Sequence, residues 1–233
     1  MSQAFAAVAI ALLVVVGLTA SNSLYDRGAP DSLPRRAVHT LGGAAFLLAV
    51  LWLDVWTAVA LSAVLALGFV TLRLSYSRGL RGVSRSGSTG DWAGIAYPAA
   101  ATISLAVGWG LLGDRWLAFV PIAYMAWGDS VAGLVRTAMR RGLMGGLARA
   151  TVWRVDMEIV WPSMAMLGVC LAAALLFQPY WVGALGAVVA TASERFRLVA
   201  HRLWDENWVP DDPIIVAASL AVMGGLARVT SMG

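Results

Sequence analysis

Three short segments of this sequence carry the residues best suited to bind a charged ligand. In the first, Arg35 and Arg36 lie four and three residues before His39, so a helix would present all three on one face. Two guanidinium groups and an imidazole on one face would bind an anion well. The simpler interpretation is that the arginines mark a helix end and that the histidine bonds to a neighbouring helix. The spacing supports the two interpretations equally.

Asp129 defines the second segment, because it is the only acidic residue inside a continuous apolar run. A carboxylate at membrane depth is costly and usually faces a cavity, a partner or an ion. Gly128, Ala132 and Gly133 leave small surfaces beside it, which would let a ligand or another backbone come close. We expect a functional role for Asp129, and the alternative is a salt bridge between helices.

The third segment is acidic and lies near the C-terminus. Glu194 closes an apolar run, and four further carboxylates follow between Asp205 and Asp212. Hard oxygen ligands beside arginines suit Mg²⁺ that bridges nucleotide phosphates, although these carboxylates could also simply neutralise the arginines. No Walker-type Gly-Lys, H-E-x-x-H or G-x-S-x-G motif is present, so the chemistries of those motifs are unsupported.

The elements that must position these residues are predicted to be membrane helices. Of the 233 residues, 60% are hydrophobic and 13% are charged, whereas a typical soluble domain carries about 25% charged residues. Too few polar side chains are present to cover a soluble globule of this size. The single cysteine, Cys170, excludes a disulfide framework and a cysteine-based metal site. We therefore expect an all-α, multi-pass membrane protein that forms one integral domain over residues 1–233.

Eight apolar runs are candidates for membrane-spanning helices, because a helix needs about 20 apolar residues to cross the hydrocarbon core. These runs are 4–20, 37–53, 55–72, 92–113, 116–135, 159–177, 180–193 and 213–227. The last two are short, so seven or nine spans are the alternatives to eight. The first run could be a signal peptide, but no positive charge precedes it, and a retained helix is favoured.

All 17 basic residues other than the two histidines are arginines, and their distribution predicts the orientation of the chain. The connections after the first, third, fifth and seventh runs hold 15 of them, and the rest of the chain holds Arg115 and Arg228. Because cationic connections stay in the cytoplasm during insertion, these four connections are predicted to be cytoplasmic and both termini non-cytoplasmic. Orientation thus explains the basic charge, and no nucleic-acid partner is expected.

Several motifs follow one another in order along the chain. They are Arg35-Arg36-Ala-Val-His39 to Gly43, Val83-Ser84-Arg85-Ser-Gly87, Gly128-Asp129-Ser-Val-Ala132, Glu194 and Asp205-Glu206-Asn207-Trp-Val-Pro210. This order resembles the CTP-dependent isoprenoid-alcohol kinase family, which includes phytol kinases and dolichol or polyprenol kinases. The resemblance covers about residues 35–220, nearly the whole chain.

Two features depart from the family pattern. The K-S-x-x-G-S element that normally follows the G-D motif is absent, and residues 149–156 carry Arg149 and Arg154 but no lysine. The second acid of the G-D motif is replaced by Gly133. Arginine and lysine are not interchangeable at a tight phosphate site. An altered phosphoryl donor, an altered substrate and loss of activity are therefore all compatible with the sequence.

The resemblance implies a membrane-embedded kinase that phosphorylates phytol, geranylgeraniol, dolichol or polyprenol with CTP at the cytoplasmic face. It implies catalytic roles for Asp129, His39 and Asp205, and Mg²⁺ ligands at Asp129, Glu194 and Asp205. The implied nucleotide- and phosphate-binding residues are Arg35, Arg36, Ser84, Arg85, Arg149, Arg154 and Asn207. The expected partners are the lipid alcohol, the nucleoside triphosphate and membrane lipid.

Two alternatives stand beside the kinase. One is a cytidylyltransferase that forms a CDP-lipid and releases pyrophosphate instead of CDP. The other is not an enzyme, and would be a transporter or a catalytically degenerate homologue of the kinases.

Overall fold

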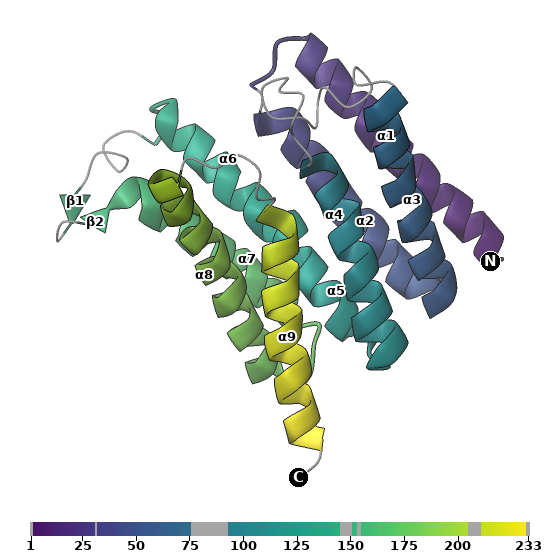
Figure 1. Cartoon of the computed structure of the whole chain (residues 1–233). Helices are drawn as coiled ribbons and strands as arrows, with labels where there is room; N and C mark the ends of the chain where they lie inside the picture. Colours follow the sequence, from purple (N-terminus) through teal and green to yellow (C-terminus); the bar gives the residue numbers. More distant parts are fainter. Residues whose placement is uncertain are drawn as a thin grey trace.

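The computed structural model describes residues 2–30, 32–75, 93–144, 151–152, 155–204 and 211–231, which form a bundle of eight helical rods (Figure 1). The first three rods are α1 (Gln3–Asp26), α2 (Ser32–Trp52) and α3 (Val55–Ser75). The fourth is α4 (Ala93–Ser104) with the π-helix η2 (Leu105–Leu111). The fifth joins α5 (Arg115–Ala123), the π-helix η3 (Tyr124–Gly128) and α6 (Asp129–Arg140). The last three are α7 (Met157–Ala174), α8 (Tyr180–Trp204) and α9 (Asp211–Ser231).

The helical bundle confirms the predicted all-α class, and each of the eight predicted runs coincides with one rod. Within the described residues, five helices are long and apolar enough to cross a membrane, and they are Gln3–Asp26, Val55–Ser75, Gly94–Leu111, Arg115–Arg140 and Pro213–Thr230. A short antiparallel ribbon of β1 (Thr151–Val152) and β2 (Val155–Asp156) precedes α7. The chain is therefore an all-α membrane bundle.

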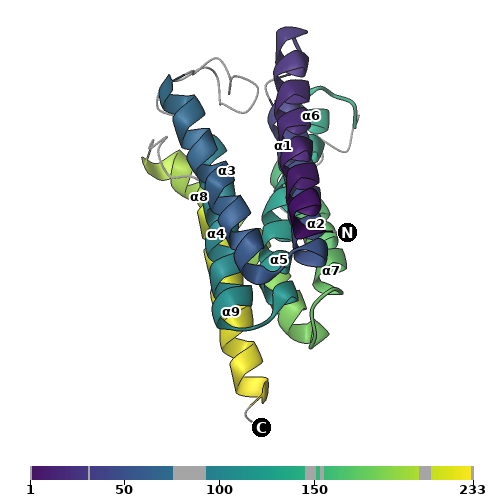
Figure 2. The same cartoon turned by 90° about the vertical axis from the view of Figure 1, so that its right-hand side faces the viewer.

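Successive rods run in alternate directions, so their ends gather in two sets. The ends that lead out of α1, α3, α6 and α8 lie at one end of the bundle, the upper end in Figure 1. These are the helix ends that adjoin the four arginine-rich connections, and we call this the arginine-rich end. Helix α9 finishes at the opposite end, which is the lower end both in Figure 1 and in the view turned by 90° in Figure 2.

The rod formed by α5, η3 and α6 lies at the centre of the bundle and carries most of the core. Every residue from Leu117 to Ala126 is buried. The phenol of Tyr124 donates a hydrogen bond to the carbonyl of Gly183 on α8, 2.7 Å away, so the deepest polar group of this rod is satisfied. Because lipid is as apolar as these side chains, close packing rather than hydrophobicity holds such helices together.

Two glycines allow neighbouring helices to come close to this central rod. A Cβ atom on Gly43 of α2 would lie 2.7 Å from the Trp127 ring nitrogen, and one on Gly128 would lie 2.7 Å from the Cys170 sulfur on α7. Any side chain at either position would push α2 or α7 outward. The cysteine is a free, buried thiol, as the single cysteine in the sequence requires. The Gly43 contact thus holds α2 against η3, and the Gly128 contact holds α7 against the same turn, which leads directly into α6.

The turn between α2 and α3 contains a carboxylate, Asp54, whose contribution to stability depends on pH. The Asp54 carboxylate accepts hydrogen bonds from the backbone N–H groups of Trp56 and Thr57, both 3.0 Å away, and from the Thr57 hydroxyl at 2.7 Å. These bonds hold the pKa of the Asp54 carboxyl below its usual range. Its contribution to stability is therefore present above the pKa that it has in the unfolded chain, and is lost as the pH falls through the lower folded pKa.

We expect Asp54→Asn to melt at a slightly lower temperature than the wild-type protein at pH 7, because the amide caps α3 less well than the charged carboxylate. This difference should shrink when the pH is lowered from 7 to a value below the folded pKa of Asp54, with melting followed by tryptophan fluorescence in detergent. A difference that is the same at both pH values would contradict the role given to the ionised carboxylate.

Candidate functional site

Helix α6 presents a polar stripe to the interior of the bundle at the arginine-rich half. Asp129, Gly133 and Arg136 are four and three residues apart, so they lie on one face of the helix. Asp129 is the first residue of α6, directly after the π-helix η3, and it is only 3% exposed. π-Helical turns alter the register of a helix and often occur at functional sites. The stripe places a buried carboxylate where α2 and α8 approach α6.

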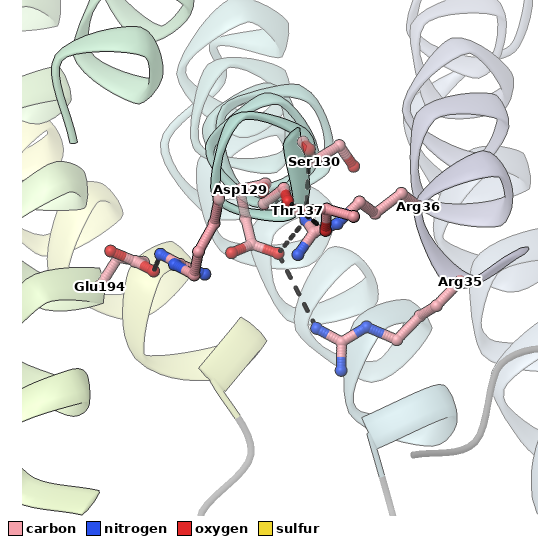
Figure 3. Close-up of polar contacts among 8 residues, drawn as sticks. Arg35, Arg36, Asp129, Ser130, Thr137 and Glu194 are labelled. Carbon is pink, nitrogen blue, oxygen red and sulfur yellow. Dashed lines mark hydrogen bonds and ion pairs between the residues drawn. The ribbon is translucent and has the colours of Figure 1, made fainter. Parts of the chain in front are cut away.

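Arg36 crosses from α2 onto this stripe (Figure 3). Its Nη1 atom donates to the backbone carbonyls of Asp129 at 2.6 Å and of Ser130 at 3.2 Å, and lies 3.7 Å from the Asp129 Oδ2 atom. The guanidinium occupies the space directly over Gly133, where a Cβ atom would overlap it. The glycine that departs from the family pattern is thus the residue that makes room for Arg36.

Arg35 reaches the same carboxylate from the neighbouring position on α2. Its Nη2 atom lies 3.9 Å from the Asp129 Oδ2 atom, and its side chain is 12% exposed, against 11% for Arg36 and 4% for Asp129. Two guanidinium groups therefore face one carboxylate at distances that are longer than a hydrogen bond. The two guanidinium groups attract the carboxylate, and the three groups together carry a net positive charge.

A second ion pair flanks the first on the α8 side, as Figure 3 shows. Arg136 Nη2 lies 2.7 Å from the Glu194 Oε1 atom, and the Glu194 side chain is 1% exposed. Arg36 lies within electrostatic range of both partners of this pair as well as of Asp129 and Arg35. We call these five residues the arginine–carboxylate cluster. It joins α2, α6 and α8 and contains three arginines and two carboxylates.

Two polar groups beside Asp129 have no hydrogen-bond partner among the described residues: the Nε–H group of Arg36, which belongs to the cluster, and the hydroxyl of Ser130, the residue that follows Asp129. Both atoms are buried, and Ser130 is 2% exposed. A buried polar group without a partner is costly, which makes such atoms informative. The Nε–H group can only donate and the hydroxyl is able to donate, so a ligand with acceptor atoms, such as phosphate oxygens, would satisfy both.

His39 lies one turn further along α2 and is 2% exposed. Its ring centroid lies 4.7 Å from that of Tyr97 on α4, and the Tyr97 hydroxyl donates to the His39 backbone carbonyl at 3.3 Å. The imidazole is thus held against α4.

The structure brings together four of the residues predicted from the sequence, Arg35, Arg36, Asp129 and Glu194, and places His39 one turn away. The salt bridge between helices, which was the alternative for Asp129, is also present in this arrangement. The remaining predicted residues lie outside the described residues: Ser84, Arg85, Arg149, Arg154, Asp205 and Asn207.

Gly133 and Arg136 belong to the site, although neither was predicted as a site residue. Their signal is the helical spacing from Asp129, because residues four and seven positions further on return to the same face. The spacing from Asp129 therefore identifies Gly133 and Arg136 as residues of the same helix face. It does not identify the residues of α2 and α8 that contact them.

The described residues do not make a complete magnesium site. No group of three or more His, Cys, Asp or Glu side chains within the described ranges could hold a metal ion. The two carboxylates of the cluster, Asp129 and Glu194, each face arginines. Magnesium prefers near-octahedral oxygen ligands, so these two carboxylates alone do not fit it, and we derive no step through a metal.

Comparison of the chain with known protein families, with curated proteins and with solved structures found no match.

Proposed function

We propose that this protein is a membrane-embedded kinase that transfers a phosphoryl group from a nucleoside triphosphate to an isoprenoid alcohol. The observation that carries the proposal is that Arg35 and Arg36 face Asp129. These residues belong to two different motifs, and Arg36 and Asp129 are 93 positions apart in the sequence. Arginines above a carboxylate, with buried donors that lack an acceptor, suit the binding of phosphate. CTP is the donor suggested by the family resemblance.

The reaction requires charge stabilisation and a proton acceptor. The lipid hydroxyl attacks the terminal phosphorus, a new O–P bond forms, and the bond from that phosphorus to the bridging oxygen breaks to release a nucleoside diphosphate. The guanidinium groups of Arg35 and Arg36 would neutralise the negative charge on the transferring group, which is the main demand of phosphoryl transfer. Asp129 and His39 would be the candidates to accept the hydroxyl proton.

The proposal places this reaction at the cytoplasmic side of the membrane. The arginine-rich end adjoins the connections that hold 15 of the 17 arginines, and such connections stay in the cytoplasm. Soluble nucleotide would then reach Arg35 and Arg36 from the cytoplasm, while the apolar tail of the alcohol lies along the apolar helix surfaces.

We expect Asp129→Asn to reduce phosphoryl transfer by about 100-fold or more, the loss typical of removing a proton acceptor. The assay supplies labelled CTP or ATP to the purified protein with phytol, geranylgeraniol, polyprenol or diacylglycerol as acceptor. Asp26→Asn is the matched control, because Asp26 is exposed at the end of α1 on the same side of the bundle. Transfer that Asp129→Asn leaves undiminished would refute the site. Release of pyrophosphate instead of a nucleoside diphosphate would favour the cytidylyltransferase.

One observation favours a second candidate, a protein of the same fold that binds nucleotide without turnover. The Arg36 guanidinium fills the space over Gly133, where the family pattern has its second acid. The cluster would then serve as a staple between helices and as an anion site. Nucleotide binding that requires Arg35 and Arg36, with no transfer to any of the four alcohols, would support this candidate over the kinase.

A further inference from the structure

A second site lies at the end of the bundle opposite the arginine–carboxylate cluster. Two hollows of about 590 and 370 Å³ share Leu112, Gly224 and Arg228 in their walls, so they form one continuous groove. We call it the lower groove. It runs along α9 and is bounded by η2, by the start of α5 and by the turn between α7 and α8. Hollows of this size are typical of sites for small molecules and single lipid chains.

The part of the lower groove between η2 and α9 is apolar. On α9, Ala217, Ala221 and Gly225 follow one another every four residues and are exposed, so this face of the helix is shallow. Ile103 and Val107 form the opposite wall. Gly225 does not bring another helix close, because a Cβ atom there would have no neighbour within 4 Å. The trough has the shape and chemistry of a seat for one hydrocarbon chain.

The other part of the lower groove is more polar and is lined by one residue of each charge. Asp114 and Arg228 both line it. The Asp114 carboxylate is turned toward the first turn of α5, where it accepts from the backbone N–H groups of Trp116 at 2.7 Å and of Leu117 at 3.1 Å. Its negative charge is therefore directed at the positive end of the helix dipole. Arg228 is exposed on the last turn of α9 and brings a guanidinium group to this part of the groove.

The position of Arg228 is unusual for this chain. It is one of two arginines outside the four arginine-rich connections, and the other is Arg115. Arg115 lies over the ring of Trp116, with its Cζ atom 5.3 Å from the ring centroid, and it does not line the groove. The two arginines thus lie at the same end of the bundle, but only Arg228 lines the groove. Arg115 is therefore a matched control for experiments on Arg228.

We propose that the lower groove binds one membrane lipid with an anionic phosphodiester headgroup, its phosphate against Arg228 and one of its chains between η2 and α9. An apolar trough that leads from membrane depth to a guanidinium at the bundle end matches such an amphiphile in shape and in charge. The site lies at the opposite end from Asp129 and goes beyond the proposed kinase activity. Its failure would leave the kinase proposal untouched, and the reverse also holds.

The test is native mass spectrometry of the detergent-purified full chain, titrated with phosphatidylglycerol or with phosphatidylcholine of the same chain length. We expect one phosphatidylglycerol to bind per chain, and about tenfold more weakly to Arg228→Gln, since a charge-assisted contact is lost. Arg115→Gln should bind it as the wild-type protein does. Equal binding of the two lipids, or an equal loss in both arginine variants, would overturn the assignment of the headgroup.

A second pair of variants tests the chain seat. Ala221→Leu fills the trough and should weaken binding of phosphatidylglycerol by about tenfold, because the lipid chain loses its contacts along α9. Ala60→Leu is the control, since Ala60 is exposed on α3 and lies outside the groove. Both variants add the same apolar side chain to an exposed helix face. Binding that is unchanged in Ala221→Leu, or reduced equally in both, would overturn the placement of the chain.

Discussion

Replacing Glu194 with leucine is expected to lower the free energy of unfolding by about 4 kcal/mol, since it leaves the Arg136 guanidinium buried without its partner. The pair is short, 2.7 Å between Nη2 and Oε1, and its two side chains are 18% and 1% exposed. Solvent therefore screens it little, unlike an ion pair on a protein surface. The loss can be measured by titration of the purified protein with denaturing detergent in mixed micelles, followed by helical circular dichroism.

The double variant Arg136→Leu/Glu194→Leu separates the pair itself from the cost of an orphaned charge. Replacing a whole buried ion pair with apolar side chains is often neutral or stabilising. We therefore expect the double variant to recover most of the stability lost in Glu194→Leu. Glu194→Gln should fall between the two, because the amide still accepts a hydrogen bond but carries no charge. If the double variant is as unstable as Glu194→Leu, the loss does not come from an unpaired Arg136.

This pair also shows which parts of the site were within reach of the sequence. The apolar run that precedes Glu194 ends at residue 193, yet the helix α8 continues to Trp204. A helix satisfies its backbone by internal hydrogen bonds, so it continues past the apolar run until its caps or packing end it. Glu194 closes the apolar run but consequently lies within the helix, where it faces α6.

The fold was easier to predict than the site for a physical reason. The hydrocarbon core requires apolar runs of a certain length, and the insertion machinery favours arginines in cytoplasmic connections. Each of these two features can be recognised in the sequence of one helix and its flanks. The pairing of Arg36 with Asp129 instead depends on α2 lying against α6, across 93 residues of chain. That approach follows from close contacts such as Gly43 against Trp127, which no single helix reveals.

The π-helical segments were beyond prediction for a related reason. A π-turn widens the helix by a residue, and its position is decided by packing with neighbouring helices rather than by the propensity of its own residues. In η2, Gly108 lies against α5, where a Cβ atom would come within 2.6 Å of the Ala118 Cα atom. In η3, the widened turn ends at Gly128 and sets the direction in which Asp129 points.

The second large effect is expected at Gly133. Replacing it with alanine should expel the Arg36 guanidinium from α6 and lower the free energy of unfolding by about 3 kcal/mol, because the charged hydrogen bonds to the carbonyls of Asp129 and Ser130 are lost. The new methyl group would overlap the guanidinium, and the helix backbone beneath it cannot move aside. Gly68→Ala is the control, since a Cβ atom on Gly68 of α3 would have no neighbour within 4 Å. There the change should be neutral or stabilising by up to about 1 kcal/mol through helix propensity.

The same substitution in an Arg36→Ala background tests the cause. With the guanidinium gone, Gly133→Ala should behave like Gly68→Ala. The loss of stability in the double variant Arg36→Ala/Gly133→Ala should therefore be about 3 kcal/mol smaller than the sum of the two single losses, as expected for residues in direct contact. The proposed function makes a parallel demand, since an expelled Arg36 cannot neutralise a phosphoryl group, and transfer should fall in Gly133→Ala while the protein remains folded. If Gly133→Ala costs the same stability with and without Arg36, then the glycine is required by some other contact of α6, and Arg36 does not rest over it.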